Sequence, residues 1–319
     1  MLIMKLKYSL ICLLALCALS CARRPAVPET RTFPKVNIPS MYADPSQRAE
    51  YVTQHYWDAF LSTSNTYHTD STIINGVEQP EVETSLATWL TLLGTQELPD
   101  AQRAVANLFS RLEAYEAADT SSHIVTRMSE IVSNYLYDPN SPYRDEDLYL
   151  PFVSGLAQSK YIPESLHPSY AYDARMCALN QRGQKAPDFS FTDIKGRAHR
   201  LYDVSADYTL LFFSNPGCEA CKEIIDELSS WPLAGYLIEE GALAVVNVYI
   251  DEQVDDWKAY QSYYPDTWYN GYDAEMLIRQ DLLYCVRAIP SLYLLDADKR
   301  VMLKDATPEK VFEYLGGIE

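Results

Sequence analysis

The sequence predicts a two-domain protein in which an all-α domain is followed by an α/β domain with a mixed central sheet. Between residues 44 and 180, apolar residues recur at steps of three and four, which is the period of an amphipathic helix. From residue 183 onward, continuous apolar runs alternate with helical segments, as in sheets whose strands are buried on both faces. A Cys-x-x-Cys pair, Cys218 and Cys221, stands where one such run leads into a helix.

The composition is that of an ordinary globular protein. Of 319 residues, 48% are hydrophobic and 22% are charged, which excludes a chain that is disordered throughout. The 44 acidic residues outnumber the 26 basic ones and give a net charge of -18. Duplex nucleic acid is bound through basic surfaces that meet its phosphates, so no nucleic-acid partner is expected.

Residues 1–20 have the pattern of a signal peptide. Lys5 and Lys7 precede an apolar stretch, Leu10–Leu19, that is too short to span a bilayer comfortably. The small residues before Cys21 resemble a bacterial lipobox, in which Cys21 becomes the lipidated first residue of the mature protein. The other interpretation is an ordinary signal peptide beside an incidental cysteine. We therefore predict a protein of the bacterial cell envelope, held to the membrane by a lipid anchor and facing the periplasm.

Residues 21–43 are expected to form an extended tether. Four prolines stand among small and polar residues in this stretch, a composition that disfavours packed helices and strands. Such a tether would hold the folded domains away from the membrane.

The helical domain, residues 44–180, is expected to hold six helices. Asp44-Pro45 suits a helix cap followed by proline in the first turn, and Gly94 suits the end of a helix. The apolar period continues to residue 179. The six helices are expected to begin near Pro45, Val82, Pro99, Ile124, Leu148 and Tyr170.

The α/β domain, residues 183–319, is expected to alternate strands and helices. Tyr208–Phe213 and Ala242–Ile250 are continuous apolar runs typical of buried strands. Two hairpins flank them, with turn signals at 193–196 and 297–299. Helices are expected at Cys218–Ser230, Leu277–Tyr284 and Pro308–Leu315.

The Cys218–Cys221 pair points to disulfide chemistry. A cysteine at a helix N-terminus faces unpaired backbone N–H groups and the positive end of the helix dipole, which favour the thiolate. The thiolate is the nucleophile in thiol–disulfide exchange, so Cys218 is the expected nucleophile. Cys221 lies one turn further along the same face and is expected to resolve the mixed disulfide.

Two other interpretations of the pair are a structural disulfide and half of a zinc site. A zinc site would need two further ligands at similar spacing, and the sequence has neither a second Cys-x-x-Cys nor a pair of histidines at ligand spacing. No metal site is therefore expected, and we expect the redox-active dithiol to work without a dissolved cofactor.

Residues 183–319 resemble a thioredoxin-fold domain of the TlpA/ResA-like, envelope-facing kind. The resemblance rests on the opening segment 186–189 (APDF), on the CEAC pair at 218–221 and on the segment 286–296 (VRAIPSLYLLD). The preceding helical part, with its join at 175–180, resembles N-terminal domains found on such lipoproteins. The resemblance implies a thiol–disulfide oxidoreductase that reduces or exchanges disulfides in envelope proteins and receives electrons from an unidentified membrane donor.

The resemblance also implies further site residues. It makes Pro290 a cis-proline beside the cysteine pair and Ile289 the residue whose backbone meets a substrate strand, whereas an ordinary trans loop is the other interpretation. The acid that thioredoxins carry on the preceding strand is absent, because Phe212 stands there. Asp251 and Glu252, just after the second buried strand, are candidate proton acceptors by analogy. Their other interpretation is a solvated strand end.

The sequence leaves the roles of two further features open. Cys177 and Cys285 could form a disulfide, Cys285 could be a third redox thiol, or both could be buried free thiols that act as small apolar residues. The aromatic insert at 263–272 either lines a peptide-binding groove or packs beneath a long insertion.

Two rival functions stand beside the oxidoreductase. A thiol peroxidase would share the fold, but the Pro-x-x-x-Thr/Ser-x-x-Cys arrangement expected there is missing. A lipid-anchored binding or assembly protein would use the thioredoxin fold only as a docking module. A structural Cys218–Cys221 disulfide with a very negative reduction potential would favour this binding protein.

Overall fold

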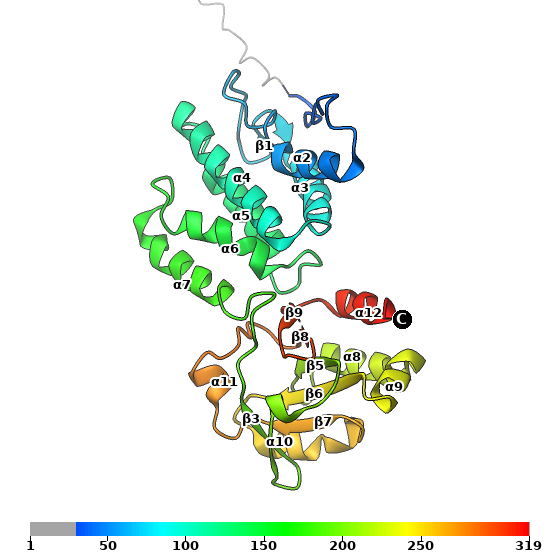
Figure 1. The fold of residues 1–319 in the computed structure, drawn as a ribbon. Helices are drawn as coiled ribbons and strands as arrows, with labels where there is room; N and C mark the ends of the chain where they lie inside the picture. Colours follow the sequence, from blue (N-terminus) through cyan, green and yellow to red (C-terminus); the bar gives the residue numbers. More distant parts are fainter. Residues whose placement is uncertain (1–29, 319) are drawn as a thin grey trace, which may run out of the picture.

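The computed structural model describes residues 30–318 (Figure 1). The predicted signal peptide, residues 1–20, and the predicted lipidation site Cys21 lie outside the described residues. Two bodies are stacked end to end: a helical domain carries the start of the described chain, and a sheet domain carries its end (Figure 1). This arrangement confirms the predicted fold class.

Within the described chain, the helical domain contains six α-helices, as predicted. Asp44 caps the first of them by accepting hydrogen bonds from the amides of Ser46 and Gln47. Asp145 caps the fifth by accepting from the amide of Leu148 at 3.0 Å. The helices are α2 (Pro45–His55), α3 (Gln79–Leu93), α4 (Leu98–Ala118), α5 (Ile124–Leu136), α6 (Glu146–Leu156) and α7 (His167–Cys177).

One short hairpin interrupts the helices. β1 (Ile73–Ile74) pairs antiparallel with β2 (Val77–Glu78) around Asn75 and Gly76, both of which have positive φ. Asn75 is buried and accepts a hydrogen bond from the hydroxyl of Tyr115 at 2.7 Å, which ties the hairpin to α4. The sequence did not predict the hairpin, because two-residue strands leave no alternation to detect.

Part of the predicted tether packs against the helical domain. Residues 30–43 form neither helix nor strand, but Arg31 and Phe33 are docked onto the helical domain. Arg31 donates hydrogen bonds to the carbonyls of Asn75 and Phe60 at 3.0 and 2.9 Å, and the rings of Phe33 and Phe60 stack at 5.0 Å. The tether prediction is wrong for this part, because local composition does not reveal contacts with residues far along the chain.

Gly155 marks the close approach of α6 to α4. A Cβ atom at position 155 would overlap the ring of Phe109, which lies in the core of the helical domain. Alanine improves helix propensity by about 1 kcal/mol, whereas overpacking a core costs about 1–3 kcal/mol. We therefore expect Gly155→Ala to lower the free energy of unfolding, measured by urea denaturation.

Gly235→Ala is the matched control for this prediction. Gly235 lies in α9 (Pro232–Glu239), and apart from the adjacent residues and the backbone of its own helix, no described atom lies within 4 Å of a Cβ built there. This substitution should raise the free energy of unfolding by about 0.5–1 kcal/mol. An equal rise for both variants would contradict the close contact at Gly155.

The C-terminal domain is built on a seven-stranded mixed sheet. Its strands are β3 (Ser190–Asp193), β4 (Ala198–Arg200), β5 (Tyr208–Phe213), β6 (Leu243–Tyr249), β7 (Tyr269–Tyr272), β8 (Ser291–Leu295) and β9 (Val301–Leu303). They lie in the order β4-β3-β7-β6-β5-β8-β9. The three central strands β7, β6 and β5 are parallel, and the outer strands pair antiparallel with their neighbours. Every residue of β6 and β8 is buried, which explains their continuous apolar sequences.

Up to residue 318, where the described chain ends, five α-helices of this domain surround the sheet (Figure 1). They are α8 (Glu219–Ser230), α9, α10 (Val254–Ala259), α11 (Leu277–Gln280) and α12 (Pro308–Gly316). α8 follows β5 after a short turn, and its buried face packs in a core shared with β5 and β8. The end of β5 and the start of α8 are therefore held by one packed core.

One prediction for this domain needs correction, and one open alternative is decided. The helix expected over Leu277–Tyr284 ends at Gln280, and residues 281–290 form an irregular segment that leads into β8. The aromatic insert supplies the unpredicted strand β7 and buries Tyr264 and Trp268, so it packs beneath the insertion. The cavity of about 440 Å³ beside the insert does not reach the cysteine pair. The helices α9 and α10 were also not predicted.

Candidate active site

Cys218 and Cys221 form a disulfide at the N-terminus of α8, with their Cα atoms 5.2 Å apart. Cys218 is the N-cap residue: the amide of Cys221 donates to Cys218 Sγ at 3.2 Å, and the Cys218 carbonyl accepts from the amide of Lys222 at 3.0 Å. Cys218 is half-buried, whereas Cys221 is almost wholly buried. The first cysteine can therefore meet another molecule, and the second lies beneath it, placed to react with the first.

The peptide bond between Ile289 and Pro290 is cis, as the resemblance implied. The register of β5 and β8 pairs Phe213 with Ser291, so Pro290 lies beside the turn that carries the cysteine pair. Ile289 packs against the same apolar cluster as Cys218. The structure thus brings together the residues nominated for the nucleophile, the resolving cysteine and the substrate contact.

The structure does not join the two candidate proton acceptors to the cysteine pair. Asp251 accepts a hydrogen bond from Asn215 Nδ2 at 2.6 Å and forms an ion pair with Arg279, also at 2.6 Å. Glu252 is exposed. In the described chain, neither carboxylate shares a hydrogen bond with either cysteine. The role of Asp251 and Glu252 in proton transfer stays a prediction.

Cys177 and Cys285 are both free and buried. This agrees with the interpretation that they are buried free thiols acting as small apolar residues. Cys177 ends α7, and Cys285 lies in the irregular segment before β8. Burial, and then the nearby charge of Glu146, raises the pKa of Cys285 to about 12, and the same two causes raise the pKa of Cys177 well above its ordinary range. Neither thiol is suited to act as a nucleophile in this state.

This burial predicts a pattern of thiol labelling. At pH 8, a thiol with a pKa near 12 is ionised in only about one molecule in 10,000. In the reduced native chain from Ala22 to Glu319, iodoacetamide should therefore modify Cys218 and leave Cys177 and Cys285 unmodified until the protein is unfolded. Peptide mass spectrometry reads out each site. Rapid native labelling of Cys285 would show that it is accessible and would reopen its role as a third redox thiol.

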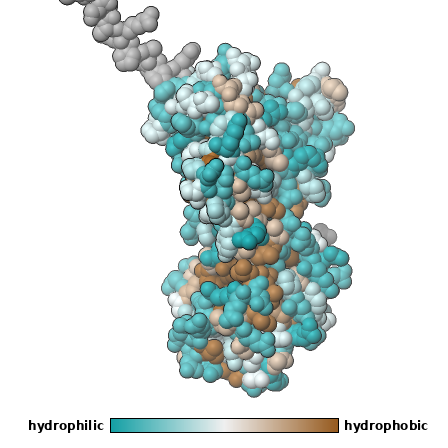
Figure 2. Space-filling view, turned by 90° about the vertical axis from the view of Figure 1, so that its left-hand side faces the viewer, coloured by the Kyte–Doolittle hydropathy of each residue, from teal (hydrophilic) through white to brown (hydrophobic). Residues whose placement is uncertain are grey.

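Apolar surface gathers on the C-terminal domain next to its join with the helical domain (Figure 2). The irregular segment 281–290 contributes to the exposed apolar area, because Leu282 is 41% exposed and Leu283, Val286 and Ile289 are only half-buried. Partly exposed apolar side chains therefore follow the segment that leads to the cis-proline.

The two domains meet through buried charges. Glu146, at the start of α6, contacts Arg287 and Lys304 of the sheet domain. Sequence reasoning missed this cluster, because its partners lie more than one hundred residues apart. One signal was available: Arg287 is the only charged residue in the stretch 283–289, three positions before Pro290.

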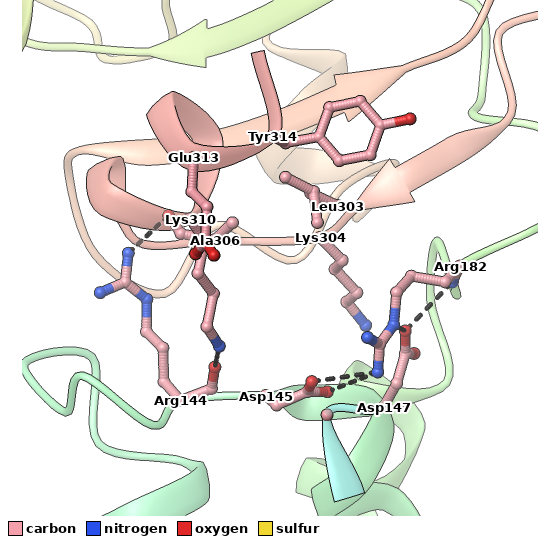
Figure 3. A pocket seen from close by; sticks show the side chains of 11 residues that line it. Arg144, Asp145, Asp147, Arg182, Leu303, Lys304, Ala306, Lys310, Glu313 and Tyr314 are labelled. Atoms are coloured by element: carbon pink, nitrogen blue, oxygen red, sulfur yellow. Dashed lines mark hydrogen bonds and ion pairs between the residues drawn. The ribbon is translucent and has the colours of Figure 1, made fainter. Parts of the chain in front are cut away.

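A cavity of about 390 Å³ lies beside this cluster, where the two domains meet (Figure 3). Arg182, in the segment that connects the domains, donates hydrogen bonds to Asp145 and Asp147 of the helical domain at 3.0 Å. Lys310 of α12 points from the other side to the backbone carbonyl of Arg144 at 3.3 Å. Charged groups from both domains and from the connecting segment therefore line the cavity, and the contacts of Arg182 and Lys310 tie these parts together.

Two further findings concern the described chain. Among residues 30–318, none of the helices combines the length and the apolar character that crossing a bilayer requires. In the same range, no group of three or more His, Cys, Asp or Glu side chains is arranged to hold a metal ion.

Comparison with known proteins identifies both parts of the chain. Residues 19–172 match a family model described as a domain of unknown function, DUF5106. A crystal structure of a thioredoxin-like protein from Bacteroides caccae is 35% identical and has a TM-score of 0.76, and the match covers 91% of this chain and 99% of that one. No curated protein matches the chain.

Two solved single domains are similar to the C-terminal part. The C-terminal domain of an uncharacterized protein from Bacteroides fragilis is 45% identical, with a TM-score of 0.42, over 43% of this chain and 98% of that one. A domain of a possible thiol-disulfide isomerase from Cytophaga hutchinsonii is 30% identical, with a TM-score of 0.39, over 44% of this chain and 93% of that one. Since the full-length likeness spans both domains, the chain belongs to the thioredoxin-like proteins and combines that fold with an N-terminal DUF5106 domain.

Proposed function

We propose that the protein is a thiol–disulfide oxidoreductase of the bacterial cell envelope that reduces or exchanges disulfides in other proteins. One observation carries the proposal: Cys218 is half-buried at the start of α8, Cys221 is buried beneath it, and the cis peptide bond at Pro290 lies beside them. A structural disulfide needs no such asymmetry, whereas exchange needs one accessible sulfur and one that reacts second.

The reaction begins from the reduced pair. The Cys218 thiolate attacks one sulfur of a substrate disulfide, forms a mixed disulfide and releases the other substrate sulfur, which takes up a proton. Cys221 then loses its proton and attacks Cys218 Sγ, which forms the Cys218–Cys221 disulfide and releases the second substrate thiol. The substrate gains two electrons and the pair loses two. A membrane protein with a reducing thiol pair would return them to the enzyme.

The local structure favours the first step. The amide of Cys221 points at Cys218 Sγ, and the N-terminus of α8 adds the positive end of its dipole, so both stabilise a thiolate on Cys218. Ile289, which precedes the cis-proline, would offer its backbone to an extended substrate strand. The partly exposed apolar side chains of residues 281–290 suit contact with apolar side chains of such a strand. The signal-peptide pattern of residues 1–20 and Cys21 support the envelope location.

Turnover of a protein disulfide tests the proposal. The chain from Ala22 to Glu319 should accelerate the reduction of insulin by dithiothreitol, followed by the turbidity of the released B chain. A rate equal to that of dithiothreitol alone, with the protein shown to be folded, would contradict the proposed function.

A further inference from the structure

The join of the two domains is built around a carboxylate of the helical domain. Glu146 begins α6, and its side chain is only 1% exposed. Its two oxygens face cations of the sheet domain: Arg287 Nε lies 2.5 Å from Oε1, and Lys304 Nζ lies 2.8 Å from Oε2. A buried carboxylate is tolerated only when it is paired closely, so this contact strongly constrains both domains.

Arg287 carries this contact to the candidate active site, because it stands three residues before Pro290. Its guanidinium donates to Glu146, to the backbone carbonyl of Tyr137 and to Asp305 Oδ2 at 3.3 Å. It also lies over the ring of Tyr137, 4.1 Å from the centroid. Burial lowers the pKa of Arg287, but Glu146 and Asp305 raise it more, so the residue keeps its charge. Two residues of the helical domain, Glu146 and Tyr137, therefore hold this side chain in place.

The other side of the cis bond belongs to the same network. Ser291 directly follows Pro290, and its hydroxyl donates to Asp305 Oδ1 at 2.7 Å. Asp305 thus joins Ser291 to Arg287, and Arg287 joins both to Glu146. The residues before and after the cis bond are held by one chain of buried contacts that is anchored in the helical domain.

The segment is also tied further upstream. Asn180, in the connection between the domains, donates to the carbonyl of Leu283 at 2.8 Å and accepts from the amide of Cys285 at 3.4 Å. The hydroxyl of Tyr293 donates to the carbonyl of Cys285 at 3.0 Å. Since residues 281–290 form no regular secondary structure, these ties and the Glu146 network fix their course.

We propose that Glu146 is a positioning residue, through which the helical domain holds the Ile289–Pro290 segment in the geometry that receives a substrate strand beside Cys218. The kinetic consequence rests on the proposed function. Loosening the segment weakens the docking of a protein substrate but leaves the sulfur chemistry of Cys218 intact. The effect should therefore fall on KM for protein disulfides and spare small disulfides, which need no strand docking.

The experiment compares two variants with a matched control in the chain from Ala22 to Glu319. Glu146→Gln keeps the size of the side chain and removes its charge. Arg287→Lys keeps the charge but replaces the planar guanidinium and its several N–H donors with one ammonium group. Arg182→Gln is the control. It breaks the ion pairs of the connecting segment with Asp145 and Asp147 at the start of α6, and Arg182 does not contact residues 286–292.

Two readouts are measured on each protein. Amide hydrogen exchange of residues 286–292 in the oxidised protein should rise about 10-fold in Glu146→Gln and Arg287→Lys and change less than about 3-fold in Arg182→Gln. KM for insulin reduction should rise about 10-fold in the first two variants, with the rate toward oxidised glutathione within about 2-fold of wild type.

The outcomes separate this inference from the proposed function. Equal exchange at residues 286–292 in Glu146→Gln and Arg182→Gln would overturn the positioning role, whatever the activity. If the wild-type protein reduces no disulfide, the proposed function fails, and the exchange readout still decides the positioning. Should Glu146→Gln not fold, Arg287→Lys and the control carry the comparison. Equal losses toward insulin and glutathione would also overturn the inference, because they would place the effect on the sulfur chemistry.

Discussion

Cys218→Ser is expected to lower the rate of insulin reduction to that of dithiothreitol alone, because it removes the nucleophile that begins the exchange. Serine keeps the shape of the turn, but its hydroxyl cannot form a disulfide with the substrate. The loss should appear in the turbidity assay while the far-UV circular dichroism of the protein stays unchanged.

Cys221→Ser separates the two steps of the reaction. It leaves the attack by Cys218 possible and removes the thiol that resolves the intermediate, so a mixed disulfide with the substrate should accumulate and appear as a mass shift on a non-reducing gel. Cys285→Ser is the matched control and should keep most of the activity, since Cys285 is free and buried away from the substrate. Equal activities for Cys218→Ser and wild type would refute the assignment of the nucleophile.

Lys304→Met is expected to lower the free energy of unfolding by about 3–5 kcal/mol, the usual cost of leaving a buried charge without its partner. Lys304 is buried, and its ammonium group contacts Glu146 and the carbonyls of Cys177 and Leu179 at the end of α7. Removing the ammonium leaves one oxygen of Glu146 without its counter-ion and two carbonyls without a donor. Methionine nearly matches the length of the side chain, so the loss would reflect these polar contacts rather than a cavity.

Lys258→Met provides the control for this measurement. Lys258 is exposed and pairs with Asp255 at 3.1 Å, so its removal should change the free energy of unfolding by less than about 1 kcal/mol. Urea denaturation of both variants, followed by tryptophan fluorescence, gives the comparison. Similar small losses for Lys258→Met and Lys304→Met would mean that the interdomain charges contribute little to stability.

The strongest local patterns of the sequence were sufficient to predict the elements that carry the cysteine pair. The apolar run Tyr208–Phe213 is a strand with these same bounds, and the helix after it begins at Glu219, one residue after its predicted start. Both elements are decided locally: the strand by burial on two faces, the helix by its cap and its apolar stripe. The cis-proline was reached through resemblance to a family, since no pattern of neighbouring residues distinguishes a cis from a trans bond.

The irregular segment before β8 could not be predicted in the same way. Residues 277–284 have a helical apolar period, yet the helix stops at Gln280 and Leu282 has a φ of +51°. The course of the segment is decided by contacts with Asn180 and Glu146, which lie more than one hundred residues away. Local propensity is a weak guide wherever such distant polar contacts determine the backbone. The role of Glu146 was invisible for the same reason.

The reduction potential of the Cys218–Cys221 couple tests the central claim most directly. The chain from Ala22 to Glu319 would be equilibrated in glutathione and dithiothreitol buffers of known potential, and the fraction of reduced pair would be read by thiol labelling. A catalytic pair should titrate within about -270 to -180 mV, the range of known thioredoxin-like catalysts. A pair that stays oxidised below about -300 mV and transfers no electrons to a protein disulfide would contradict the account and would favour the binding protein.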